Sequence, residues 1–216
     1  MLAVIALPAI CFAQPPGSCK VAFTGKQPII KDYAKAYCSQ FDNDSFERQA
    51  LAAFNKGNHK KGKTECIVDV KNGYVKYTAP EGDALRSIEM CYWNCDNKNE
   101  KLVAVNTIDS SMGFDESFLT FYRYNVKTKK MRQIETPFDR NPNAIDLVDQ
   151  NTADKKTIEM VMTAKNEDAN KFQPSFSLPR VGKDITYHMA DQNAIPKQYQ
   201  REGKLIWDGN SFCHEN

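Results

Sequence analysis

Histidine and tryptophan are scarce in this chain, and neither sign of charge prevails. The 216 residues include three histidines and two tryptophans, and 29 Lys and Arg against 27 Asp and Glu leave a formal net charge of +2. This balance excludes a dedicated polyanion-binding surface and argues against a disordered chain. The basic cluster His59, Lys60, Lys61 and Lys63 has no interleaved aromatic residues. We interpret it as a solvated turn after a helix, and we expect no nucleic-acid partner.

Motifs that carry catalytic or metal chemistry are also missing from the sequence. There is no G-x-S-x-G motif, and residues 110–111, a pair of serines, are assigned to a polar loop. Cys91, Cys95, Cys213 and His214 are donors of the zinc-binding type, but their spacing differs from that of structural zinc sites. The acidic strings lack the calcium-loop pattern. The sequence therefore predicts no cofactor and no metal site.

Long apolar runs are nearly absent, and the one at residues 1–12 is too short for a membrane span of about 20 residues. Together with Ala13 and the Pro-rich segment that follows, this run predicts a signal peptide over residues 1–13, although no Lys or Arg precedes it. We expect export to the periplasm, the cell surface or the medium, and no transmembrane segment in the mature protein. Residues 14–27 are expected to form a flexible N-terminal segment.

Removal of this leader would leave six of the seven cysteines, because Cys11 lies within it. An even number in an exported protein predicts a disulfide framework, whose connectivity stays open. In a straight strand Cys91 and Cys95 would lie about 13 Å apart, beyond the roughly 7 Å that a bridge allows, whereas an early turn would let them pair. Lipid modification of Cys19 is an alternative to its pairing. The disulfide candidates are Cys19, Cys38, Cys66, Cys91, Cys95 and Cys213.

The first part of the expected domain has helical patterning. Apolar residues recur at near-helical spacing over 28–41, and a second stripe covers 46–54. Ser45 is an N-cap candidate for the second segment, and Gly57 would end it. We therefore predict a helical hairpin, or one broken helix, within residues 28–57.

From residue 64 onward the pattern changes to short alternating runs separated by turns. An Asn72-Gly73 turn lies between 65–70 and 74–78. The clearest hairpin spans Ile88–Ile108, and a third joins Phe118–Val126 to Met131–Ile134. Four later runs also read as strands, the second as an edge strand: 158–163, 172–178, 184–189 and 205–207.

Residues 142–169 are the least regular stretch, and a short helix is an alternative there. The fold class predicted is α+β, in which the helical hairpin precedes an antiparallel β-meander shaped as a sandwich, a barrel or a strongly curved sheet. We expect a single domain over residues 28–216, with its β-rich part at 64–216.

Aromatic residues on the predicted strands are the candidates for ligand contact, since rings on a sheet can stack on a sugar or grip a peptide. The same rings are also ordinary core residues. The face shared by Tyr122 and Tyr124 is the most promising patch. The candidate ligand-binding residues are Tyr92, Trp93, Tyr122, Arg123, Tyr124, Tyr187 and Trp207.

Four segments stand out in the second half of the chain: M-C-Y-W-N-C-D-N-K-N-E-K-L-V-A-V (90–105), F-L-T-F-Y-R-Y-N-V-K-T-K-K-M (118–131), S-L-P-R-V-G-K-D-I (177–185) and L-I-W-D-G-N-S-F (205–212). They resemble segments of a group of small secreted proteins of unknown function from Gram-negative gut anaerobes of the Bacteroides type. The resemblance covers most of the chain after residue 85. It implies export to the periplasm or cell surface, and it assigns no activity and no catalytic residue.

Three functional hypotheses follow from these features. The first is an exported, non-enzymatic binding or structural module whose partner is a small ligand, a glycan or a protein. The second is a hydrolase that uses His188 with an acidic partner, Asp184 or Asp191. The third is an inhibitor of an extracellular enzyme, built on a rigid exposed loop.

Overall fold

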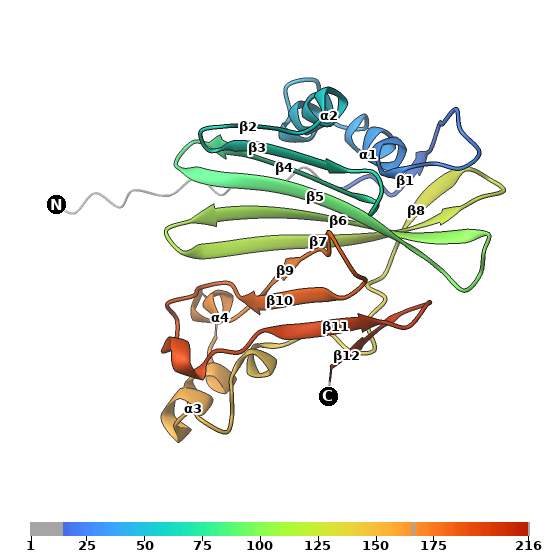
Figure 1. The fold of residues 1–216 in the computed structure, drawn as a ribbon. Coiled ribbons are helices and arrows are strands. Elements are labelled where there is room, and N and C mark those ends of the chain that lie inside the picture. The colour runs from blue at the N-terminus through green and yellow to red at the C-terminus, as the bar shows by residue number, and fades with distance from the viewer. Residues whose placement is uncertain (1–14, 166, 216) are drawn as a thin grey trace.

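The computed structural model describes residues 15–165 and 167–215. The predicted signal peptide at 1–13 and Cys11 therefore lie outside the described residues. The chain is a mixture of helices and strands, with two antiparallel sheets and two helices on the outer face of the larger sheet (Figure 1). The predicted α+β class and the antiparallel sheet are thereby confirmed.

The larger sheet has eight strands in the order β1-β8-β7-β6-β5-β4-β3-β2, so that β2 to β8 form a meander and β1 is added beside β8. The strands are β1 Ser18–Lys20, β2 His59–Lys61, β3 Thr64–Asp69, β4 Tyr74–Glu81, β5 Ala84–Asn94, β6 Glu100–Ser111, β7 Phe114–Asn125 and β8 Lys130–Ile134. The predicted hairpin at 88–108 corresponds to β5 and β6.

The connection between β6 and β7 is tighter than the sequence suggested. Met112 and Gly113 have φ values of 47° and 85°, as a two-residue type I′ hairpin turn requires. Ser110 and Ser111, which were expected in a polar loop, therefore end β6 and pair with the start of β7.

Two helices, α1 (Ile30–Cys38) and α2 (Phe46–Lys56), cover one face of the larger sheet. The hydroxyl of Ser45 accepts a hydrogen bond from the N–H of Arg48 at 3.2 Å, as expected for an N-cap. The apolar faces of the helices bury residues of β4 to β8 in a first core. The basic residues of 59–61 form edge strand β2 and not a turn after the helix, and lysines on such an edge discourage pairing with other chains.

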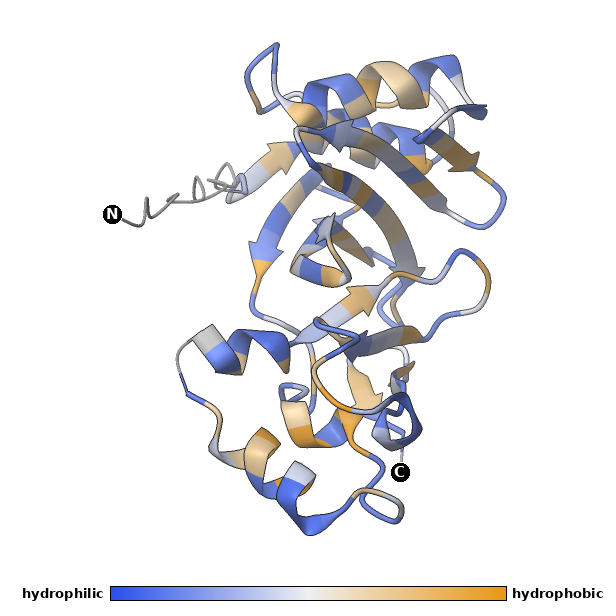
Figure 2. Ribbon diagram, turned by 90° about the vertical axis from the view of Figure 1, so that its left-hand side faces the viewer, coloured by the Kyte–Doolittle hydropathy of each residue, from blue (hydrophilic) through white to orange (hydrophobic). Residues whose placement is uncertain are grey.

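The opposite face of the larger sheet packs on the second sheet across a separate core. Figure 2 shows the larger sheet between the two helices above it and the smaller sheet below it. The second sheet has the order β12-β11-β10-β9. Its strands are β9 Pro174–Ser177, β10 Ile185–Met189, β11 Gly203–Trp207 and β12 Phe212–His214. The predicted edge strand at 172–178 is thus β9, at an edge.

One predicted strand is wrong. Residues 158–163 belong to helix α3 (Lys155–Thr163), because the carboxylate of Asp154 caps its first turn through the N–H of Thr157 at 2.7 Å. The buried residues Thr157 and Val161 are four positions apart, which is helical spacing. The remaining short helices are η1 Ala144–Leu147, α4 Glu167–Lys171 and η2 Lys197–Tyr199.

The predicted disulfide framework is not observed. All six cysteines within the described residues are free thiols, five of them buried and Cys213 exposed. Cys19, Cys38 and Cys66 belong to the first core, whereas Cys91 and Cys95 belong to the second. Burial in packed apolar surroundings therefore accounts for five of these residues without a covalent bond.

Candidate functional site

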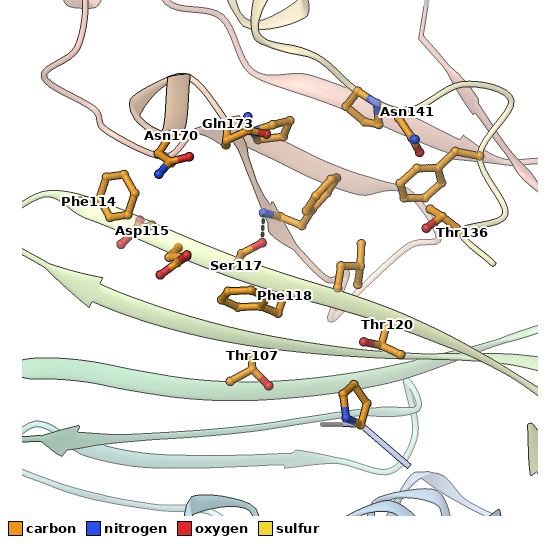
Figure 3. A pocket seen from close by; sticks show the side chains of 18 of the residues that line it. Thr107, Phe114, Asp115, Ser117, Phe118, Thr120, Thr136, Asn141, Asn170 and Gln173 are labelled. Carbon is orange, nitrogen blue, oxygen red and sulfur yellow. Dashed lines mark hydrogen bonds between the residues drawn. The ribbon is translucent and has the colours of Figure 1, made fainter. Parts of the chain in front are cut away.

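A cleft of about 610 Å³ lies at the first half of β7, which is within the usual range for ligand sites. β8 pairs only with residues 121–125 of β7, and Phe114 forms a bridge with Asp191, so residues 116–120 of β7 form a free stretch at the edge of the larger sheet. The turn before β9 and the segment after β8 close the cleft on the other side (Figure 3). The labelled lining residues are Thr107, Phe114, Asp115, Ser117, Phe118, Thr120, Thr136, Asn141, Asn170 and Gln173.

The backbone of this edge points hydrogen-bonding groups into the cleft. The N–H of Asp115 donates to the carbonyl of Ala190 at 2.8 Å, on the side away from β6. Alternate residues of an antiparallel strand direct their N–H and C=O groups to the same side, so those of Ser117 and Leu119 also face away from β6. No other backbone group in the described part of the chain meets them. The hydroxyl of Ser117 accepts the N–H of Phe176 at 3.0 Å, which holds β9 against the face of β7 that looks towards the second sheet (Figure 3).

The charged side chains in the cleft are all acidic. Glu47, Asp115 and Glu116 line it, and no Lys, Arg or His is found among the described residues that do so. Threonine hydroxyls and carboxamides supply further polar groups, and Phe118, with 42% of its surface exposed, supplies an apolar one. This composition suits a ligand with positive charge and hydrogen-bond donors.

Asp115 also contacts the histidine that the sequence singled out. The Nε2 atom of His188 lies 3.2 Å from a carboxylate oxygen of Asp115. This hydrogen bond lowers the pKa of Asp115, although partial burial acts in the opposite direction. The predicted acidic partners are wrong: Asp184 pairs with Lys204 at 3.2 Å, and Asp191 accepts the N–H of Asn193 at 2.8 Å.

The predicted ligand-binding rings lie mostly in the two cores. Tyr122 and Tyr124 have no exposed surface, because Tyr37 and Tyr33 of α1 pack on them with ring centroids 5.9 and 5.2 Å apart. The face shared by Tyr122 and Tyr124 is therefore a helix-covered core and not a wet patch.

The other four aromatic residues and the arginine also make contacts within the protein. Trp93 packs on Trp207 at 6.0 Å and donates its indole N–H to the carbonyl of Lys183. Tyr187 is buried in the second core, Tyr92 is partly buried against the first, and Arg123 pairs with Glu100 at 3.6 Å. The structure does not bring these residues together into one open site.

No arrangement for a metal ion is found in residues 15–165 and 167–215. The zinc-type donors are dispersed, since Cys91 and Cys95 are buried while Cys213 is exposed. The Nδ1 atom of His214 lies 2.7 Å from Asp139. Within the same residues, no helix has the length and apolar character needed to cross a membrane.

Sequence reasoning missed most of the residues that line the cleft. Ser117 and Leu119 matter through their backbone, which no side-chain pattern reveals. Glu47 had a usable signal, because it shares a helix face with Ala50 and Phe54, at positions i, i+3 and i+7. A glutamate within an apolar stripe is unusual, and here it is 5% exposed.

Comparison with known proteins gives no further guide to the site: no family model, curated protein or solved structure matches the chain.

Proposed function

We propose that the protein is an exported, non-enzymatic binding module whose ligand occupies the cleft beside β7. The observation that carries this proposal is the free stretch of β7, where the backbone groups of Ser117 and Leu119 have no backbone partner among the described residues and face a cleft with acidic walls. Export rests on the apolar N-terminal segment, and it agrees with the resemblance to secreted proteins.

The architecture supports this proposal. We propose that the two sheets form a sandwich and that α1 and α2 form the predicted helical hairpin. The larger sheet has a packed core on each of its faces, and this packing holds the edge of β7 in place. A preformed site loses little conformational entropy when a ligand binds.

The test compares a variant that fills the cleft with a matched variant elsewhere. The side chain of Gln173 is exposed at the cleft, so Gln173→Trp should block it, whereas Gln198 is exposed outside it. Immobilised peptide and glycan libraries would be screened with the wild type, Gln173→Trp and Gln198→Trp. A ligand that is lost only with Gln173→Trp supports the proposal. Blank libraries, or ligands that bind Gln173→Trp equally well, contradict it.

A hydrolase is the second candidate, because Asp115 lines the cleft and holds His188. Asp115 also accepts a hydrogen bond from the hydroxyl of Ser110. This hydroxyl therefore contacts the carboxylate and not the imidazole of His188. A hydrolase of this type needs a nucleophile within hydrogen-bonding distance of His188. Among the described residues, the polar partner of that ring is Asp115, which is not such a nucleophile. A hydrolase screen in which His188→Ala abolishes an activity would favour this candidate over a binding module. The inhibitor hypothesis rests on the sequence alone.

A further inference from the structure

One carboxylate at the cleft belongs to a largely buried residue. Glu47, at the start of α2, is 5% exposed, and no hydrogen bond or ion pair joins its side chain to another described residue. A carboxylate in such surroundings gains from a cationic partner. Glu47 lines the cleft, so a cation that enters the cleft can supply this interaction.

A second carboxylate lies on the same side of β7. Glu116 is opposite Asp109 in β6, which is opposite Arg86 in β5. Paired residues of adjacent strands project to the same face, and the guanidinium of Arg86 lies 5.3 Å from the ring centroid of Phe46 in α2. Glu116 and Glu47 therefore approach the cleft from the helix-covered face of the sheet.

The backbone of the edge sets the shape of the partner. Residues 116–120 of β7, which lie between the bridge to Asp191 and the pairing with β8, span about 13 Å at roughly 3.3 Å per residue. This is the length of four or five residues of an extended chain. Strand addition to a free edge uses backbone hydrogen bonds for affinity and alternate side chains for specificity. A glycan has no regular row of amides to match this edge.

We propose that the cleft binds an extended basic polypeptide segment as an added strand beside β7, with a Lys or Arg side chain against Glu47 and Glu116. This inference rests on the proposed binding function and names its ligand class. A second copy of the chain is a poorer occupant, since pairing two β7 edges would bring together two sets of acidic residues with no base between them.

The geometry predicts which amides of the partner are used. Residues opposite Ser117 and Leu119 exchange backbone hydrogen bonds with β7, whereas the residues between them turn their N–H groups away. The residues between them place their side chains on the face of Glu116. In a Thr-Lys alternating peptide, lysines therefore occupy these intermediate positions, and the threonine amides bond to the edge.

The experiment uses the octapeptide (Thr-Lys)4, titrated against the protein by calorimetry at 0.15 M salt. Two analogues carry N-methyl groups on all threonine amides or on all lysine amides, and a third has Glu in place of Lys. We expect binding of the parent and of the lysine-methylated peptide, and no binding of the threonine-methylated or glutamate peptides. Equal binding of the two methylated peptides would show charge attraction without strand addition and would overturn the proposal, as would no binding of the parent.

Glu47→Gln tests the buried carboxylate while preserving its shape. We expect about tenfold or greater loss of affinity for (Thr-Lys)4, because a hydrogen bond to a charged group is replaced by a neutral one. Glu202→Gln, at an exposed position outside the cleft, should bind as the wild type does. Equal affinity of the Glu47→Gln variant and the wild type would remove the proposed lysine contact.

The two proposals fail in different ways. If the libraries yield a glycan or an acidic peptide that Gln173→Trp excludes, binding at the cleft stands and the basic-strand inference falls. If (Thr-Lys)4 binds the Gln173→Trp variant unchanged, both fail. A concentration-dependent dimer that Ser117→Pro abolishes would identify a second copy as the occupant and overturn the inference.

Discussion

The carboxylate of Glu89 in β5 accepts a hydrogen bond from the backbone N–H of Leu178, just after β9, at 2.8 Å. This bond links the larger sheet to the second one. The same carboxylate also accepts the hydroxyl of Tyr74 at 2.9 Å and the amide of Asn106 at 3.1 Å, and Lys76 lies 3.8 Å away. Glu89 is 2% exposed, so donors of the protein replace the water that it would otherwise bind.

Truncation of Glu89 should therefore be strongly destabilising. Glu89→Ala leaves the donors of Tyr74, Asn106 and Leu178 buried without an acceptor, and we expect the free energy of unfolding to fall by about 3–5 kcal/mol. Urea denaturation followed by tryptophan fluorescence measures this change.

Two further variants serve as comparisons for Glu89→Ala. Glu89→Gln keeps one acceptor oxygen and should lose clearly less than Glu89→Ala. Glu202→Ala, at an exposed position, should stay within about 0.5 kcal/mol of the wild type. If Glu89→Ala unfolded at the same urea concentration as Glu202→Ala, the link between the sheets would contribute nothing to stability.

Gly203 is the second stability determinant that we single out. It is opposite Tyr187 in the second sheet, and a Cβ atom at this position would overlap the ring of Tyr187. Gly203→Ala must displace a buried ring, so we expect a loss of about 1–3 kcal/mol in the free energy of unfolding. Gly17→Ala is the matched control, because a Cβ atom there has no neighbour within 4 Å. A Gly203→Ala variant as stable as the Gly17→Ala variant would contradict this packing.

The role of Gly203 also shows why sequence reasoning succeeds in some places and fails in others. The hairpins at 72–73 and 88–108 depend on adjacent residues, so local turn chemistry predicted them. The close approach of Gly203 to Tyr187 joins separate strands. His188 likewise pairs with Asp115, 73 positions away, and not with its acidic neighbours in sequence.

Burial is a second reason for the failures. Tyr122 and Tyr124 alternate on β7 as predicted, but alternation does not reveal that α1 covers their face. Conversely, the apolar positions in residues 158–163 fit both the helical and the strand periodicity. The Asp154 cap favours the helix, which is the structure observed.

Asp115 gives the protein a defined acid sensitivity. Its pKa lies below the ordinary value of 3.8, mainly through the hydrogen bond with His188. A depressed pKa in the folded state contributes stability above the unfolded-state value and loses it as the pH falls through the folded-state value. The difference in unfolding free energy between the wild type and Asp115→Asn should therefore shrink as the pH falls below about 4.

The His188→Ala variant checks the origin of this effect. It removes the hydrogen bond that lowers the pKa of Asp115, so its difference from the wild type should shrink over the same pH range. A difference between wild type and Asp115→Asn that stayed constant down to pH 3 would show that the contact has no influence on the titration of Asp115.

The cysteines allow a direct choice between the observed thiols and the predicted disulfides. Burial raises the pKa of Cys19 and of Cys66 to about 11, and it holds that of Cys91 well above its ordinary value. These thiols are therefore poor nucleophiles at pH 8 as well as inaccessible. With a chromogenic disulfide reagent and the native protein without residues 1–13, we expect one rapidly reacting group among the six described cysteines, Cys213, which is exposed.

Substitution identifies that group, and unfolding counts the rest. Cys213→Ser should abolish the rapid phase, and guanidinium should then release the five buried thiols. Their unreactive native state would follow from packing, because covalent pairing would keep them silent after unfolding too. A chain without any reactive thiol in guanidinium, and with thiols only after reduction, would show instead that export is followed by oxidation and that the disulfide framework inferred from the sequence forms.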